Sequence, residues 1–220
     1  MYIKLKPIAV LWRILILVKA VEAFFSLLDL PSGIGNLGLL QYFYMLTALF
    51  IIIYYAVLDW WYIDDTKKEN TCVVPILKGM LTVTALFTMV ISHFVISKGH
   101  IPIFEEATPD LQLKYIIPIM IFIDWLLFDK KGGYKAFFPL VWCLPAILYT
   151  SYIYISVIAL KTPVGSSGMY PYTFFDYQTN GVSQTIMILL AFAIINIAIG
   201  YIIFGLDKLS TKLSMSLKKG

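Results

Sequence analysis

Four side chains that could act as acid, base or nucleophile fall at a similar depth in four different apolar stretches. Glu22 supplies a carboxylic acid, Tyr44 a phenol, His93 an imidazole and Lys114 an amine, and Thr47 follows Tyr44 by nearly one helical turn. A rise of about 1.5 Å per helical residue places the first four roughly 5 to 10 Å from one end of their helices. Such a set could give a polar cavity a nucleophile and a general base, so Tyr44, Thr47, His93 and Lys114 are candidate catalytic residues.

The same residues also have a structural interpretation. Glu22 can pair with Lys19 on its own helix, His93 can hydrogen-bond a neighbouring backbone, and the long side chain of Lys114 can reach lipid headgroups. Each residue taken singly fits this alternative. The catalytic hypothesis therefore depends on the set converging on one cavity.

A second polar layer lies near the opposite ends of the apolar stretches. Arg13, Asp59 and Asp124 each fall within about 8 Å of that end. A cation and a carboxylate that pair inside an apolar bundle fix helix packing without needing a substrate. These three residues are predicted to form a structural ion pair.

The elements that must position these residues are transmembrane helices. The chain is 60% hydrophobic and 14% charged, with a mean hydropathy of +0.83, which leaves too little polar surface for a soluble globule of 220 residues. A spanning helix needs about 20 mostly apolar residues. The predicted fold is all-α, a single bundle of six spans at approximately 8–30, 39–63, 74–96, 111–128, 136–160 and 183–204.

The distribution of lysine predicts the orientation of this bundle. Positively charged residues favour the cytoplasmic connections. Only Lys98 and Lys161 fall in the connections of one side, with Lys114 just inside a span. The connections and tails of the other side hold twelve, namely Lys4, Lys6, Lys67, Lys68, Lys78, Lys130, Lys131, Lys135, Lys208, Lys212, Lys218 and Lys219. Both termini are therefore predicted to be cytoplasmic.

The connection between the last two spans is unusually aromatic for an exposed loop. It runs Tyr170-Pro171-Tyr172-Thr173-Phe174-Phe175-Asp176. It could fold back as a lid over an outward-facing cavity, or lie flat as an interfacial anchor. With Glu22, its residues Tyr170, Pro171, Tyr172, Phe174 and Asp176 are the candidate binding residues.

Three stretches resemble the Pr6Pr family of bacterial six-span membrane proteins, which is distantly similar to the animal androgen-induced-gene family. The aromatic loop, followed by Gly181, is the most specific of them. The others are Tyr115-Ile116-Ile117-Pro118 continuing to Ile123-Asp124-Trp125-Leu126-Leu127-Phe128, and Leu206-Asp207-Lys208-Leu209. With Arg13 and the Tyr42-Phe43 region, the resemblance covers nearly the whole chain in order.

The resemblance implies a hydrolase chemistry, but this chain has other residues at the two positions that carry it. The animal relatives are intramembrane threonine hydrolases that act on fatty acid esters of hydroxy fatty acids, with a threonine in span two and a histidine in span four. The family pattern places threonine directly after Phe43 and histidine four residues before Pro118, where this chain has Tyr44 and Lys114. A phenol and an ammonium do not reproduce that pair. Loss of the hydrolase chemistry is the simpler inference.

Three functions remain as hypotheses. The first is a non-catalytic membrane protein that binds a partner, or a lipid or fatty-acyl ligand from the outer leaflet. The second is an intramembrane lipid-ester hydrolase, and the third is a small-solute or proton-coupled transporter that uses Glu22, His93 and Asp124. The lysines form no stripe for nucleic acid, and no spacing predicts a metal site or a cofactor.

Overall fold

A computed structural model describes residues 6–29, 37–64, 74–99, 108–165 and 168–216, with the backbone alone at 6, 59–64 and 214–216. All regular structure in these ranges is helical. Four helices in the described part are long and apolar enough to cross a membrane, as expected for a helical membrane protein: Pro75–Ile96, Pro109–Phe128, Phe138–Ala159 and Val182–Leu213.

Helices occupy each of the predicted apolar runs. The first two are α1, Lys6–Leu28, and α2, Phe43–Asp64, which follows the short 3₁₀ helix η2, Leu37–Gln41. The third is α3, Pro75–Ile91, which continues as the π-helix η3, Ser92–Ile96. The fourth begins with α4, Pro109–Leu111, and the π-helix η5, Gln112–Ile116, and ends with α5, Ile117–Phe128.

Each helical run can be viewed as a rod, and proline interrupts the fifth rod but not the last one. The rod comprises α6, Phe138–Val141, α7, Leu144–Tyr154, and the π-helix η6, Ile155–Ala159, and its break at Trp142 and Cys143 falls between Pro139 and Pro145. The outer connection contains η7, Thr173–Phe175, and α8, Tyr177–Asn180. The chain then forms α9, Val182–Ser216. This helix continues beyond the predicted span at approximately 183–204, because Asp207 and the lysines that follow are compatible with a helix.

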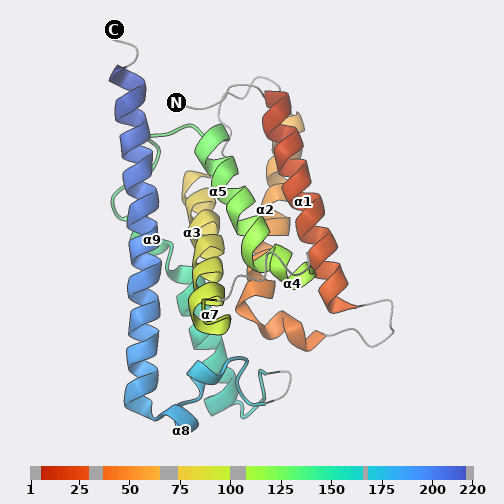
Figure 1. The fold of residues 1–220 in the computed structure, drawn as a ribbon, viewed down its shortest axis with the longest axis vertical. Coiled ribbons are helices and arrows are strands. Elements are labelled where there is room, and N and C mark those ends of the chain that lie inside the picture. Colours follow the sequence, from red (N-terminus) through yellow and green to blue (C-terminus); the bar gives the residue numbers. More distant parts are fainter. Residues whose placement is uncertain (1–5, 30–36, 65–73, 100–107, 166–167, 217–220) are drawn as a thin grey trace.

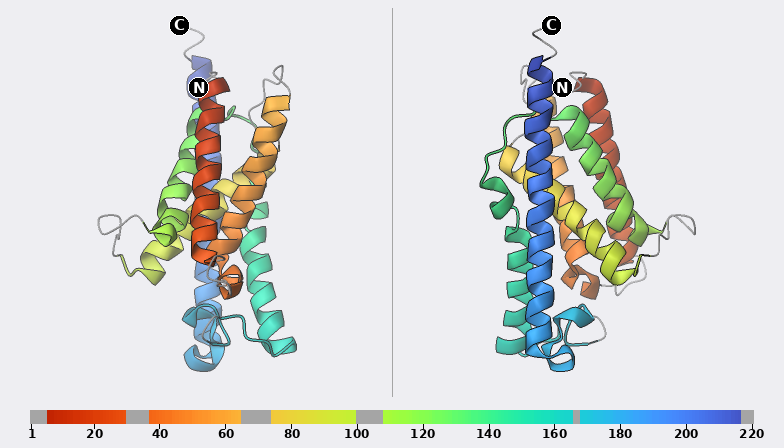
Figure 2. Two further views of the ribbon diagram at one scale, coloured as in Figure 1. Left: turned by 90° about the vertical axis from the view of Figure 1, so that its right-hand side faces the viewer. Right: turned by 60° about the vertical axis from the view of Figure 1, so that its left-hand side comes forward.

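The rods alternate in direction along the bundle (Figure 1). The start of α1 and the end of α9 lie at the same end, which we call the terminal end, and α8 lies at the opposite end. α3 packs against α2, α5 and α9, while α1 packs against α2 and α5. Figure 2 shows α7 beside the lower half of α9, away from α1.

Candidate functional site

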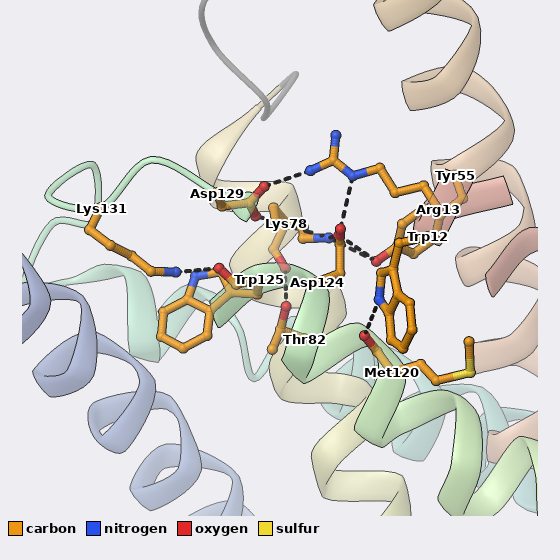
Figure 3. Close-up of polar contacts among 10 residues, drawn as sticks. All are labelled: Trp12, Arg13, Tyr55, Lys78, Thr82, Met120, Asp124, Trp125, Asp129 and Lys131. Atoms are coloured by element: carbon orange, nitrogen blue, oxygen red, sulfur yellow. Dashed lines mark hydrogen bonds and ion pairs between the residues drawn. The ribbon is translucent and has the colours of Figure 1, made fainter. Parts of the chain in front are cut away.

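Five buried side chains from four helices and one helix end form an ionic cluster near the terminal end of the bundle (Figure 3). Arg13 of α1 donates from Nε to Asp124 Oδ1 and from Nη2 to Asp129 Oδ1, each at 2.9 Å. Lys78 of α3 donates to Asp124 Oδ2 and, at 2.8 Å, to the hydroxyl of Tyr55. The Tyr55 hydroxyl in turn donates to Asp124 Oδ2 at 2.9 Å. We call Arg13, Tyr55, Lys78, Asp124 and Asp129 the inner ion cluster.

The inner ion cluster is balanced in charge. Two cations face two carboxylates, and the side chains of Arg13, Lys78 and Asp124 are fully buried. Lys78 Nζ also lies 4.0 Å from Asp129 Oδ2. Removing charges from water is costly unless each finds a partner, so these contacts specify how α1, α3 and α5 pack. Each charged side chain of the cluster thus has an oppositely charged partner within 4.0 Å.

The sequence predicted one contact of this cluster and missed the rest. Arg13 and Asp124 form the predicted pair. The side chain of Asp59, the third predicted member, lies outside the described residues. The assignment of Lys78 to a cytoplasmic connection is wrong: it lies in the first turn of α3 and is fully buried, because Asp124 and Tyr55 bind its ammonium. Asp129 was missed because it stands one residue after α5.

The loop after Asp129 is held to α9 by Asp207. The Asp207 carboxylate accepts the backbone N–H of Gly132 at 2.9 Å and that of Tyr134 at 3.3 Å. Gly132 has a φ of +94°, a conformation that favours glycine. Lys131 folds back to donate to the Trp125 carbonyl, with its Nζ 3.6 Å from the centre of a Trp125 ring. Asp207 therefore connects the loop after α5 to the last helix.

Two of the predicted catalytic or binding residues are paired at or near the surface. Glu22 accepts from Lys19 at 2.7 Å, and both side chains are exposed, as the structural alternative described. Lys114, within η5, donates to Asp110 at 2.6 Å, and its ammonium lies 4.6 Å from the centre of the Tyr44 ring. The Lys114 ammonium thus contacts a carboxylate and a ring face.

Thr47 and His93 are not brought together as a nucleophile and its base. The Thr47 hydroxyl donates to the Phe43 carbonyl at 2.9 Å and lies 3.3 Å from the hydroxyl of Thr88. The His93 ring packs edge-on against Phe94 and Tyr115, with centroid distances of 4.7 and 6.2 Å. The outer candidates therefore do not form one polar cavity.

A mostly apolar pocket of about 460 Å³ lies instead between α3, α7 and α9. Its walls include Phe87 of α3, Ile147 of α7 and Leu189 of α9, and of the predicted catalytic residues Tyr44 reaches it. Among the residues that the structure describes, no lysine, arginine, histidine or carboxylate lines it. We call this space the apolar pocket. Its size and lining are those of a site for a hydrophobic ligand.

The aromatic loop covers the end of the apolar pocket nearest α8. Tyr172, Phe174 and Phe175 line the pocket. The Phe174 ring packs on Phe192 of α9 at 5.0 Å, and Phe175 packs on Tyr149 of α7 at 6.0 Å. The loop therefore folds back onto the helices, which is the lid arrangement and not the flat anchor. Of its candidate binding residues, Tyr172 and Phe174 contact the pocket.

Three other predicted binding residues of the loop have local roles. Tyr170 packs on Tyr154 with a centroid distance of 6.4 Å, and Pro171 is buried. Asp176 caps α8, accepting from the Thr179 hydroxyl at 2.6 Å and from the backbone N–H of Gln178 at 2.9 Å. The hydrogen bond from the Thr179 hydroxyl is the main cause that lowers the pKa of Asp176 from its ordinary value.

The apolar pocket could not be located from the sequence, since its walls come from ordinary apolar positions of three helices. Pro139 and Pro145 flank the break before α7, and Cys143 within this break lines the pocket. Among the described residues, no cluster of three or more His, Cys, Asp or Glu could hold a metal ion. Comparisons with protein-family models, curated proteins and solved structures find no match to this chain.

Proposed function

We propose that this protein is a six-span membrane protein that binds the hydrocarbon chain of a lipid in the apolar pocket and performs no catalysis on it. The observation that carries the proposal is the pocket itself, about 460 Å³, without charged side chains and roofed by Tyr172 and Phe174. A hydrocarbon chain fills such a space without desolvating any ion. The proposal agrees with the resemblance to the Pr6Pr family and assigns the aromatic loop a role as a cover.

The proposed orientation places both termini in the cytoplasm of a bacterium. The start of α1 and the end of α9 lie at one end of the bundle. Lys130 and Lys135 stand in the connection after α5, and Lys212 stands near the end of α9. Lys98 and Lys161 follow the helices that run the other way. This bias supports the cytoplasmic assignment of the terminal end. The apolar pocket then opens at the depth of the outer leaflet.

Hydrolysis has less support than binding. The Thr47 hydroxyl donates to the Phe43 carbonyl, and the His93 ring contacts aromatic side chains. Lys114 pairs with Asp110, and its ammonium lies over the face of the Tyr44 ring. Transport has less support too, because Glu22 pairs with Lys19 at the surface and Asp124 pairs with two cations.

Photocrosslinking tests the binding proposal. The full chain in lipid nanodiscs is exposed to a phospholipid whose acyl chain carries a diazirine, and the labelled peptides are mapped. We expect labelling around Leu189 and Tyr149, which line the pocket. Ala193→Trp fills the pocket and should abolish this labelling. Ile194→Trp is its control, because Ile194 is the next residue of α9 and is 66% exposed on the helix surface. Equal labelling of both variants would overturn the proposal.

A second measurement addresses catalysis. A fluorophosphonate probe and generic acyl esters are offered to the purified full chain. We expect neither labelling at Thr47 or Tyr44 nor ester hydrolysis. Labelling of either residue, abolished by its substitution, would instead establish the hydrolase hypothesis.

A further inference from the structure

The apolar pocket contains one polar side chain that the protein leaves unsatisfied. Asn196 of α9 lines the pocket and is 1% exposed. Its carboxamide oxygen, Oδ1, has no hydrogen-bond donor among the described residues. A buried amide without partners is costly, so a native protein that keeps one usually satisfies it with a water or a ligand.

Two other polar side chains of the pocket donate hydrogen bonds within their own helices. The hydroxyls of Thr88 and Thr150 donate to the carbonyls of Thr84 and Ala146, one turn earlier in their own helices, each at 2.9 Å. Such side chains do not require a donor from a ligand. Asn196 is different, because its oxygen is an acceptor and the backbone N–H groups around it are committed to helix hydrogen bonds.

Water is a poor partner for Asn196. An ordered water needs two to four polar contacts, and the pocket-lining neighbours of Asn196 on α9, namely Phe192, Ala193 and Ile197, supply no polar side-chain atom. Phe192 lies one turn nearer to the aromatic loop, so Asn196 is about 6 Å deeper along the helix than the contact between Phe192 and Phe174. A ligand that enters under the loop can reach this depth.

From this arrangement we infer that the apolar pocket selects a neutral amphiphile with a single hydroxyl or amide N–H group, which donates to Asn196 Oδ1. The inference rests on the proposed lipid-binding function. The ligand should be neutral, because no cation among the described residues lines the pocket to pair with a carboxylate or phosphate. An alcohol or amide group satisfies the Asn196 acceptor, whereas a plain hydrocarbon leaves it unpaired.

Competition between two matched ligands tests the inference. Hexadecanol and hexadecyl methyl ether have the same hydrocarbon chain, but only the alcohol carries a donor. Each is used to displace the diazirine phospholipid from the full chain in nanodiscs. We expect the alcohol to compete about tenfold better than the ether, the size of one buried hydrogen bond.

Two variants locate the preference. Asn196→Leu should remove the preference, because it should weaken the binding of the alcohol and leave the binding of the ether unchanged. Thr150→Val is the control: it alters a hydroxyl that lines the same pocket but already donates to Ala146, so the preference should persist. Asn196→Ala serves as a second test at the same position, because it is smaller and cannot crowd the pocket.

The outcomes separate the inference from the function on which it rests. Equal competition by the alcohol and the ether in the unaltered protein, or a preference that survives in both Asn196 variants, overturns the donor inference and leaves lipid binding intact. If the pocket peptides are never labelled by the diazirine phospholipid, lipid binding itself fails, and the donor inference fails with it.

Discussion

At the scale of single residues, the charged side chains of this protein should differ in how much folding stability is lost when each is replaced. The inner ion cluster holds Arg13, Lys78 and Asp124 away from solvent, so each charge depends on its partners alone. Glu22 and Lys19 are an ion pair of similar geometry, but both side chains are exposed on the surface of the bundle. Burial therefore decides which carboxylate the fold requires.

Asp124→Asn should destabilise the protein strongly. The change leaves Arg13 and Lys78 buried with one carboxylate fewer, and breaking a buried pair in this way costs about 3–5 kcal/mol. Thermal unfolding in detergent measures the loss. Glu22→Gln is the matched control, and should change stability by less than about 1 kcal/mol. Similar melting temperatures for the two variants would contradict the structural role of the cluster.

The cap of α8 should respond to acid. Hydrogen bonds from Thr179 and Gln178 lower the pKa of Asp176 below its model-compound value of 3.8. A group whose pKa is lowered by folding stabilises the fold above its unfolded pKa and loses that contribution as the pH falls through the folded pKa. The difference in stability between the unaltered protein and Asp176→Asn should therefore be constant near neutral pH and shrink below pH 3.8. A difference that grows on acidification would show that Asp176 is not the acceptor.

At the scale of helices, close approach depends on small residues. Gly79 of α3 lies against the Trp142 ring, and a methyl group at this position would overlap with the ring. Trp142 is fully buried and donates from its indole N–H to the Ile76 carbonyl at 2.9 Å. The contact therefore joins α3 to the break between α6 and α7, next to the apolar pocket.

Gly79→Ala should destabilise this contact by about 1–3 kcal/mol, since Trp142 has little room to move. Gly205→Ala in α9 is the comparison, because a methyl group there meets nothing within 4 Å. Alanine favours the helix over glycine by up to about 1 kcal/mol, so this variant should be neutral or more stable. Thermal unfolding of both variants checks the contrast, and two equal shifts would refute it.

The helices could be predicted from the sequence, whereas most of their contacts could not. Apolar runs bounded by proline, glycine and charges mark α1, α3 and α5 closely, because length and hydropathy are properties of one segment. The partner of Lys78 depends on how α3 is rotated against α5. A lysine in the first turn of an apolar helix has the same sequence pattern whether it extends to headgroups or binds a buried carboxylate.

The apolar pocket was unpredictable for a related reason. Asn196 was passed over among the apolar residues of α9, and nothing in a single sequence indicates that its amide faces a space between three helices. The aromatic loop was recognisable by composition, but the choice between a lid and an anchor needed the contacts of Phe174 and Phe175 with α9 and α7.

At the scale of the whole molecule, the proposed six spans make a definite prediction about sidedness. In a background of Cys72→Ser and Cys143→Ala, single cysteines at Asp29, Lys161 and Lys212 report on three exposed positions. A membrane-impermeant maleimide applied to intact cells should label Asp29→Cys and Lys161→Cys, and should label Lys212→Cys only after permeabilisation. The reason is that α1 and the α6–α7 rod both run away from the terminal end, whereas α9 returns to it.

Labelling of Lys212→Cys in intact cells would place the lysine-rich end outside, against the charge bias. Protection of Asp29→Cys would instead mean that α1, with Arg13, Lys19 and Glu22 along it, does not cross the membrane.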